Sequence, residues 1–298
     1  MGNTTLLFVG YGFSRKGPYF VFDQLDTQKR VVLSILSKTM SLELLDERFC
    51  IGTYDLVSFE TKPCIQQSKL PLKGKNYCKY CNQINGFNPA FYNTNKISPQ
   101  QQRYNNQPHV VYMAYFSNSC VKVGIASKKR HLTRLLEQGA RAAIILDEFP
   151  NASLARQLEA KLCSNEKINE VVSSERKLRL ITESNYSFDD AKKVLNYYCE
   201  HYYRRKPLSD IINLQSFYFP ADASPPTVSS LENQKDAMIS GKIIGMVGDI
   251  VFIEHNSSFV YAISIKKYVS HLVRYYPNES VFSYSLPPKQ YTIWDLMQ

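Results

Sequence analysis

The sequence predicts an α+β fold, with β-rich N- and C-terminal segments on either side of a central α/β domain. Runs of aromatic and β-branched residues, broken by glycine and proline, dominate both ends of the chain. Between them, apolar strand patterns alternate with helical stripes. Stretches rich in Asn, Gln or Pro separate these regions. We therefore expect three parts, which cover residues 1–107, 108–207 and 208–298.

The N-terminal part is predicted to hold three strands, a cysteine-bearing segment and a linker. The strand patterns cover residues 6–9, 19–22 and 30–36. Glycine and proline punctuate them at Gly10, Gly12, Gly17 and Pro18. Residues 82–108 have little periodicity, which favours a long loop and a boundary between domains.

The central part alternates strands and helices in the order expected of a small α/β sandwich. Strands are predicted at 110–115, 121–124 and 142–146, the first two joined by a turn at 117–119. Helices are predicted at 129–138, where Gly139 ends the helix, at 152–162, and at 187–203 with Ser187 as the N-cap.

The C-terminal part follows a proline-containing connector at residues 219–229. Three short strands are predicted at 241–247, 250–254 and 259–265. One arrangement open to these strands is pairing with the N-terminal strands in a common sheet. The α/β domain would then be inserted between two halves of one β domain.

The charge of the chain favours an anionic partner. The 298 residues carry a formal net charge of +10, which points first to nucleic acid and next to an acidic membrane surface or an acidic protein. No apolar run approaches the roughly 20 residues of a membrane helix, and the first residues lack the basic start of a signal peptide. We expect a cytoplasmic protein that is not inserted in a membrane.

Four of the seven cysteines fall in one short stretch and predict a zinc site. Cys78 and Cys81 form a Cys-x-x-Cys knuckle, while Cys50 and Cys64 stand at the ends of a predicted hairpin. In a reducing cytosol such a cluster favours metal ligation over disulfides. The alternatives are ordinary buried thiols or a redox dithiol, which the lack of a βαβ pattern around Cys78 disfavours.

A second constellation combines Tyr112 on one strand, Lys122-Val123-Gly124 on the next, Arg134 on a helix and Glu159 on a later helix. In order and spacing it resembles the GIY-YIG nuclease domain over residues 110–162. It departs from that pattern in its first motif, Val110-Val111-Tyr112, and in Lys122, which replaces the second tyrosine. Most of the chain is also similar to a bacterial family defined only as a domain of unknown function, which is regarded as GIY-YIG-like. That similarity extends to the four cysteines and to the strand at 241–245, with Leu135 in place of the usual tryptophan.

The resemblance implies a metal-dependent phosphodiesterase that acts on DNA or RNA. Tyr112 would orient or activate water, Arg134 would offset charge on the phosphate, and Glu159 would hold a catalytic Mg²⁺ or Mn²⁺. Lys122 would hold a phosphate or favour the phenolate of Tyr112. The alternative is a protein that binds nucleic acid, or acts as an adaptor, without cutting. Ordinary surface charges and a packed core tyrosine would explain the same residues without any site.

Two further segments have the composition of nucleic-acid contacts. Lys128, Lys129, Arg130 and Arg141 make one region basic, which suits binding of a phosphate backbone. A solvated charged surface, or a docking surface for an acidic protein, explains the same pattern. Residues 197–206 interleave aromatic and basic residues. They are suited either to stacking on single-stranded bases or to packing a helix end.

Overall fold

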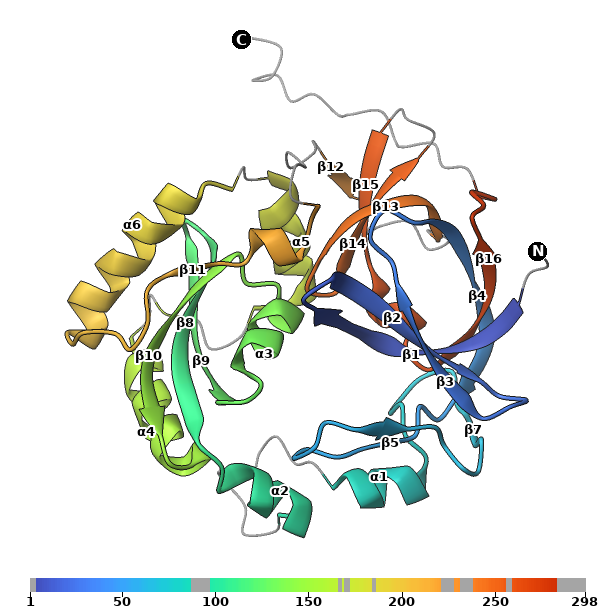
Figure 1. Cartoon of the computed structure of the whole chain (residues 1–298), viewed down its shortest axis with the longest axis horizontal. Helices are drawn as coiled ribbons and strands as arrows, with labels where there is room; N and C mark the ends of the chain where they lie inside the picture. Colours follow the sequence, from blue (N-terminus) through green and yellow to red (C-terminus); the bar gives the residue numbers. More distant parts are fainter. Residues whose placement is uncertain are drawn as a thin grey trace.

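The computed structural model describes residues 4–86, 97–165, 168, 172–183, 186–220, 228–230, 238–255 and 259–282. Within these ranges the fold is α+β, as predicted, with a large β-rich half and a smaller α/β half (Figure 1). No helix among these residues is both long and apolar enough to cross a membrane.

The large sheet joins strands from both ends of the chain in the order β12-β15-β14-β13-β4-β16-β1-β2-β3. Its N-terminal strands are β1 (Thr4–Ser14), β2 (Gly17–Gln24), β3 (Lys29–Ser34) and β4 (Thr39–Phe49), and the short β7 (Lys69–Leu70) pairs with β4. Its C-terminal strands are β12 (Val228–Ser230), β13 (Ile239–Val247), β14 (Ile250–His255), β15 (Phe259–Ser264) and β16 (His271–Pro277).

N- and C-terminal strands alternate at the centre of this sheet. Leu6 of β1 pairs with Val273 of β16, and Leu42 of β4 pairs with Ile239 of β13. The α/β half is therefore inserted between two parts of a single sheet. Gly10 and Gly12 do not end the first strand, contrary to the prediction, because β1 continues through them with a bulge between Phe8 and Gly10.

The α/β half is built on a sheet with the order β11-β10-β8-β9. Its strands are β8 (His109–Ser117), β9 (Cys120–Ser127), β10 (Ala142–Phe149) and β11 (Ile212–Asn213). Its helices are α3 (His131–Gln138), α4 (Ala152–Cys163) and α6 (Phe188–Tyr198), with a π-helical turn at Cys199–Tyr203. The predicted elements of this region are confirmed. Ser187 caps α6 through its bond from the Asp190 amide, and Gly139 ends α3 in the left-handed region.

Alternate residues of β8 serve two different cores because successive strand residues point to opposite faces. Tyr112 and Ala114 belong to the core that the α/β half shares with the large sheet, together with Leu135 and Leu136 of α3. Val111 and Met113 face a second core, which α4 and α6 cover. The two cores explain why β8 is buried along its whole length.

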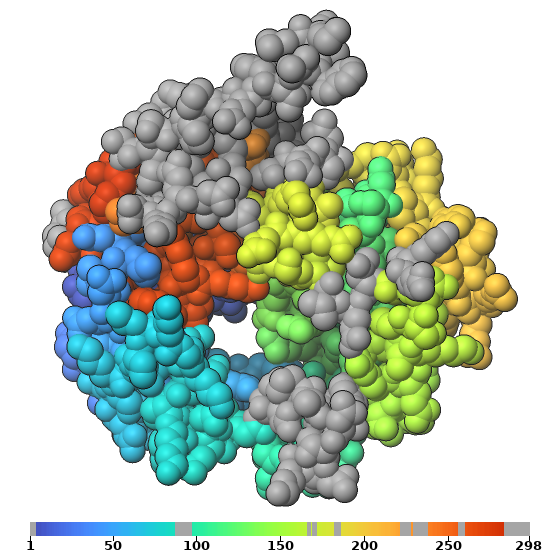
Figure 2. Space-filling model, turned by 180° about the vertical axis from the view of Figure 1, so that it is seen from behind, coloured from blue at the N-terminus to red at the C-terminus, as the bar shows by residue number. Residues whose placement is uncertain are grey.

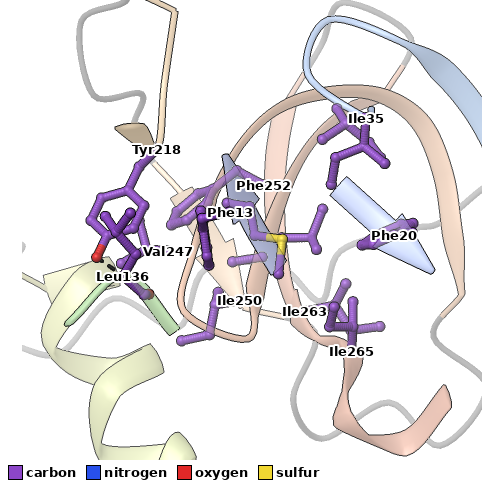
Figure 3. Close-up of a cluster of buried hydrophobic side chains, with 14 of the residues drawn as sticks. Phe13, Phe20, Ile35, Leu136, Tyr218, Val247, Ile250, Phe252, Ile263 and Ile265 are labelled. Atoms are coloured by element: carbon purple, nitrogen blue, oxygen red, sulfur yellow. Dashed lines mark hydrogen bonds between the residues drawn. The ribbon is translucent and has the colours of Figure 1, made fainter. Parts of the chain in front are cut away.

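The shared core fixes the two halves against each other. Leu136 lies against Tyr218 and Val247 (Figure 3). The Tyr218 hydroxyl also donates to the Ala140 carbonyl over 2.6 Å. Gly139 and Gly248 meet backbone to backbone, since a Cβ added at Gly248 would lie 3.0 Å from the Gly139 nitrogen. Only residues without side chains permit this approach between α3 and the β13–β14 turn.

The predicted linker at 82–108 is corrected in part. Helix α1 (Lys79–Asn85) overlaps the first residues of the predicted linker, and α2 (Pro99–Asn105) lies near its C-terminal end. Ser98 accepts a bond from the Gln101 amide, and Pro99 takes the first helical position, so a local helix signal outweighs the polar composition. Residues 87–96 of that linker and 221–227 of the predicted connector lie outside the described ranges. Helix α5 (Ser174–Glu183) was not predicted.

Candidate functional site

The four clustered cysteines of the sequence come together as a candidate metal site. Their sulfur atoms all lie within 4.8 Å of one another, with 3.7 Å between Cys64 and Cys81 and 4.0 Å between Cys64 and Cys78. A tetrahedral zinc with Zn–S bonds of about 2.3 Å places its sulfurs roughly 3.8 Å apart. The cluster therefore fits a tetrahedral metal such as zinc.

Local backbone geometry brings these sulfurs together. Cys50 follows β4, and the hairpin of β5 (Thr53–Tyr54) and β6 (Thr61–Lys62) returns the chain to Cys64. Cys78 is the N-cap of α1, and its sulfur accepts a bond from the Cys81 amide. The Cys78 amide in turn donates to the Cys50 sulfur over 3.2 Å. Such N–H···S bonds stabilise thiolates, which are the form that binds metal.

Residues 50–86, here called the metal-binding segment, are anchored at both of their sides (Figure 1). Arg48 is buried and donates to the Pro71 carbonyl and the Asn76 side chain, which holds the segment to β4. At the hairpin tip, the Phe59 ring lies 5.5 Å from the guanidinium of Arg130, just before α3. The segment therefore bridges the large sheet and the α/β half.

A separate cavity of about 300 Å³ lies where the two halves meet. Seen from behind, the surface is hollowed between the segment that holds β9 and α3, the α5 segment and the C-terminal strands (Figure 2). Among the described residues that line it, the cations come from β9, α3, α5 and a 3₁₀ turn at Ile265–Tyr268: Lys122, Arg134, Lys177 and Lys266. Glu137 is the acid in this lining, and Arg130 binds its carboxylate at 2.6 and 2.8 Å. The cavity, here called the basic pocket, suits an anion.

Lys177 is the buried member of this group. Its side chain is 8% exposed, and burial lowers the pKa of the ammonium to about 8. The nearby carboxylate of Asp249 opposes this shift, whereas Lys266, Lys122 and Arg134 add to it. Asp249 is itself buried, 3.8 Å from the Lys266 ammonium, and accepts a bond from Ser264. An anion in the pocket would relieve the repulsion among these cations.

Tyr112 lies behind the basic pocket. It is 1% exposed, and its hydroxyl donates to the Gln138 side chain over 3.0 Å, while Gln138 lines the cavity. Burial raises the pKa of Tyr112 to about 12, although the nearby Arg134 lowers it and Glu159 raises it further. The phenol is therefore protonated at neutral pH in the absence of ligand. The two roles expected of Lys122, holding a phosphate or favouring the phenolate, stay predictions.

Gly124 has a packing role that accounts for the glycine of the second motif. It pairs directly with Tyr112 across the β8–β9 hairpin, and a Cβ on Gly124 would lie 2.5 Å from the Tyr112 oxygen. We expect Gly124→Ala to displace the Tyr112 ring and to lower the free energy of unfolding by about 1–3 kcal/mol, as overpacked cores do. Urea unfolding measures this loss. Gly10→Ala is the control, because a Cβ added at Gly10 has no other atom within 4 Å, and it should lower the free energy of unfolding by less. Gly74 is unsuitable as a control because its φ is positive.

Glu159 lies near enough to Tyr112 to raise its pKa but does not line the basic pocket. It is 5% exposed on α4, and its carboxylate pairs with Arg156 of the same helix. Within the described residues, the cysteine cluster is the group of three or more metal-binding side chains that comes together. A divalent metal at Glu159 stays a prediction.

The four basic residues predicted to contact nucleic acid occupy different environments. Lys128 is exposed and pairs with Glu148, Lys129 is exposed, and Arg130 pairs with Glu137. Arg141 is only 4% exposed, with its guanidinium 4.5 Å from the Tyr186 ring centroid, and burial lowers its pKa to about 10. Arg141 therefore packs against an aromatic ring in the interior, and its burial argues against a direct phosphate contact.

One family model, described as "Protein of unknown function (DUF2797)", matches residues 37–273. The chain belongs to this family. The matched range contains all four clustered cysteines and the pocket lysines and arginine of β9, α3, α5 and the 3₁₀ turn. No curated protein and no solved structure matches the chain significantly.

Four residues of the basic pocket were not predicted from the sequence: Tyr11, Val172, Lys177 and Lys266. Tyr11, Lys177 and Lys266 belong to β1, α5 and the turn after β15, and Val172 precedes α5. Only the tertiary fold brings these distant positions to Lys122 and Arg134. Lys177 lies on α5, whose sequence is rich in basic residues, but this helix was not predicted.

Proposed function

We propose that the protein binds nucleic acid by taking a backbone phosphate into the basic pocket. The observation that carries this proposal is the convergence of Lys122, Arg134, Lys177 and Lys266 on one cavity. Such a site holds phosphate by charge and hydrogen bonds and gains affinity as counterions leave the nucleic acid. The net charge of +10 favours the same class of ligand.

A metal-dependent phosphodiesterase at the same place is the second candidate. It is favoured by the proximity of Arg134 and Glu159 to the Tyr112 hydroxyl, evident in their opposite effects on its pKa. Arg134 would contact the phosphate, and Glu159 would hold Mg²⁺ or Mn²⁺ after parting from Arg156. Tyr112 acts in this scheme as a neutral hydrogen-bond donor through Gln138 and not as a base.

We further propose that the cysteine cluster holds a structural zinc. Four sulfur ligands leave no open position for water or substrate, so the metal would fix the fold of its segment without taking part in chemistry. Because the hairpin tip contacts Arg130, which binds Glu137, the metal-binding segment also helps to shape the wall of the basic pocket.

Labelled DNA and RNA separate the two candidate functions. Pure protein is incubated with single- and double-stranded forms of each, with Mg²⁺, Mn²⁺ or EDTA, over a range of salt concentrations. Binding that falls steeply with salt, without cleavage, supports the binding protein. Cleavage that EDTA abolishes supports the enzyme. The proposal is wrong if neither DNA nor RNA is retained at low salt.

If cleavage is found, Glu159→Gln is expected to abolish it while keeping or improving retention, because one negative charge near the phosphates is lost. Glu47→Gln, on an exposed carboxylate that pairs with Lys69, serves as the matched control and should cleave normally. Equal cleavage rates for the two variants would show that Glu159 does not hold the metal. Gel-based rates at saturating Mg²⁺ provide the measurement.

The lowered pKa of Lys177 predicts a pH dependence of binding. The ammonium is protonated below about pH 8 and loses its charge above it, so affinity for phosphate should fall as pH rises through that value. Without ligand, the free energy of unfolding should rise with pH between about pH 8 and 10. In that range Lys177 is still protonated in the unfolded chain but has lost its proton in the folded protein. Lys177→Met should bind weakly at every pH, as anisotropy titrations would measure. An unchanged pH profile in this variant would contradict the assignment.

A further inference from the structure

The C-terminal end of α6 carries a cluster of aromatic rings, Tyr197, Tyr198, His201 and Tyr202, two of which are exposed. The Tyr197 and His201 rings are stacked, with centroids 4.0 Å apart and planes inclined by 29°. Tyr198 and Tyr202 lie 5.3 Å apart, and Tyr197 lies 5.8 Å from Tyr198. Tyr197 is 44% exposed and His201 is exposed as well. This arrangement, here called the aromatic cluster, presents ring surface to solvent.

Two of these rings, Tyr198 and Tyr202, are partly buried and pack against the second core, whereas Tyr197 and His201 lie outside it. Cys199 and Tyr203 are the buried residues of the π-helical turn, and the Tyr203 hydroxyl donates to the Leu146 carbonyl over 2.9 Å. These two residues hold the turn to the α/β core and leave the Tyr197 and His201 rings exposed. Single turns of π-helix are frequent at functional sites because they change which side chains face outward.

The charges next to the cluster define the chemistry of a partner. Arg204, Arg205 and Lys206 follow it directly and are all exposed, whereas Glu200 is the acidic residue of the segment 197–206. Arg204 ends the turn in the left-handed region at φ 58°, and its guanidinium donates to the His201 carbonyl over 2.9 Å. A partner that complements this surface is a polyanion with flat faces.

We propose that the aromatic cluster and the following basic run form a stacking surface for the unpaired bases of single-stranded nucleic acid. Exposed tyrosine and histidine rings stack on bases of any sequence, and the adjacent cations hold the backbone. This inference rests on the proposed binding of nucleic acid and specifies its strandedness. The surface lies on the α6 side of the α/β sheet, opposite the face that α3 covers near the basic pocket (Figure 1). The two contacts can therefore be removed separately.

Fluorescence anisotropy with three probes of equal length tests the inference: a single-stranded oligonucleotide of about 15 nucleotides, its duplex, and a phosphodiester chain without bases. We expect the wild type to bind the single strand most tightly. Tyr197→Ala combined with His201→Ala should weaken this binding roughly tenfold and leave binding of the baseless chain unchanged. Tyr197→Trp, which keeps a stacking ring, should retain full affinity. Circular dichroism verifies that the variants are folded.

The outcomes separate this inference from the proposed function. If the wild type binds the single strand and the double alanine variant binds it equally well, the stacking surface is refuted and the pocket proposal stands. Equal affinity of the wild type for the baseless chain and the single strand also refutes stacking. If the wild type binds none of the probes at low salt, both proposals fail.

Discussion

Cys78→Ser is expected to abolish binding of the proposed zinc and to unfold the metal-binding segment. Binding of structural zinc supplies on the order of 10–16 kcal/mol in small zinc-binding domains, and a segment with few apolar contacts does not replace that energy. Its own core consists of Cys50, Cys64 and Cys81 with a few partly buried neighbours. Metal analysis should find about one zinc per wild-type chain and much less in the variant. Limited proteolysis should cut the variant within residues 50–86.

Cys163→Ser is the matched control because Cys163 is partly exposed at the end of α4, outside the cluster. It should keep its zinc and resist the protease. A wild type that is purified without metal and is fully soluble and protease-resistant would contradict the zinc assignment. Chelation of the wild type offers an independent route to the same state.

Charge reversal in the basic pocket is expected to give the largest loss of nucleic-acid binding. Lys122→Glu with Arg134→Glu removes two of the pocket cations proposed to hold phosphate and adds two anions. Each charged hydrogen bond contributes about 1.5–3 kcal/mol, so affinity should fall by a hundredfold or more. The slope of log affinity against log salt should decrease by about two.

The control is Lys29→Glu with Lys73→Glu, which changes the net charge equally at exposed positions that do not line the basic pocket. If both double variants weaken binding to the same extent, overall charge and not the pocket accounts for affinity. Filter binding with single-stranded DNA and RNA at several salt concentrations makes this comparison.

Local sequence signals predicted the central elements well because short-range chemistry decides them. Gly139 and Ser187 mark the ends of helices through backbone geometry and capping, and the β8–β9 hairpin follows from its strand composition. The cysteine cluster was equally predictable, since the knuckle spacing of Cys78 and Cys81 reflects local folding. The cysteine cluster itself is confirmed.

The basic pocket was only half predictable. Lys122 and Arg134 stood out by their order along the chain, but Lys266 gains its place through a 3₁₀ turn far away in sequence. Arg141 is a residue that the sequence assigned to the basic surface but that the fold buries. Its guanidinium packs on the Tyr186 ring. Sequence composition does not distinguish a surface cation from one that packs on an aromatic ring.

The pairing of β1 with β16 has a consequence for synthesis on the ribosome. Leu6 finds its partner only when Val273 emerges, so one edge of the first strand has no neighbour for most of translation. Contacts that distant in sequence also slow closure of the sheet after release. The α/β half is complete much earlier, since its strands and helices pair within residues 109–213. We therefore expect nascent chains to fold from the middle outward, with the exposed β1 edge as the step most open to aggregation and to chaperone binding.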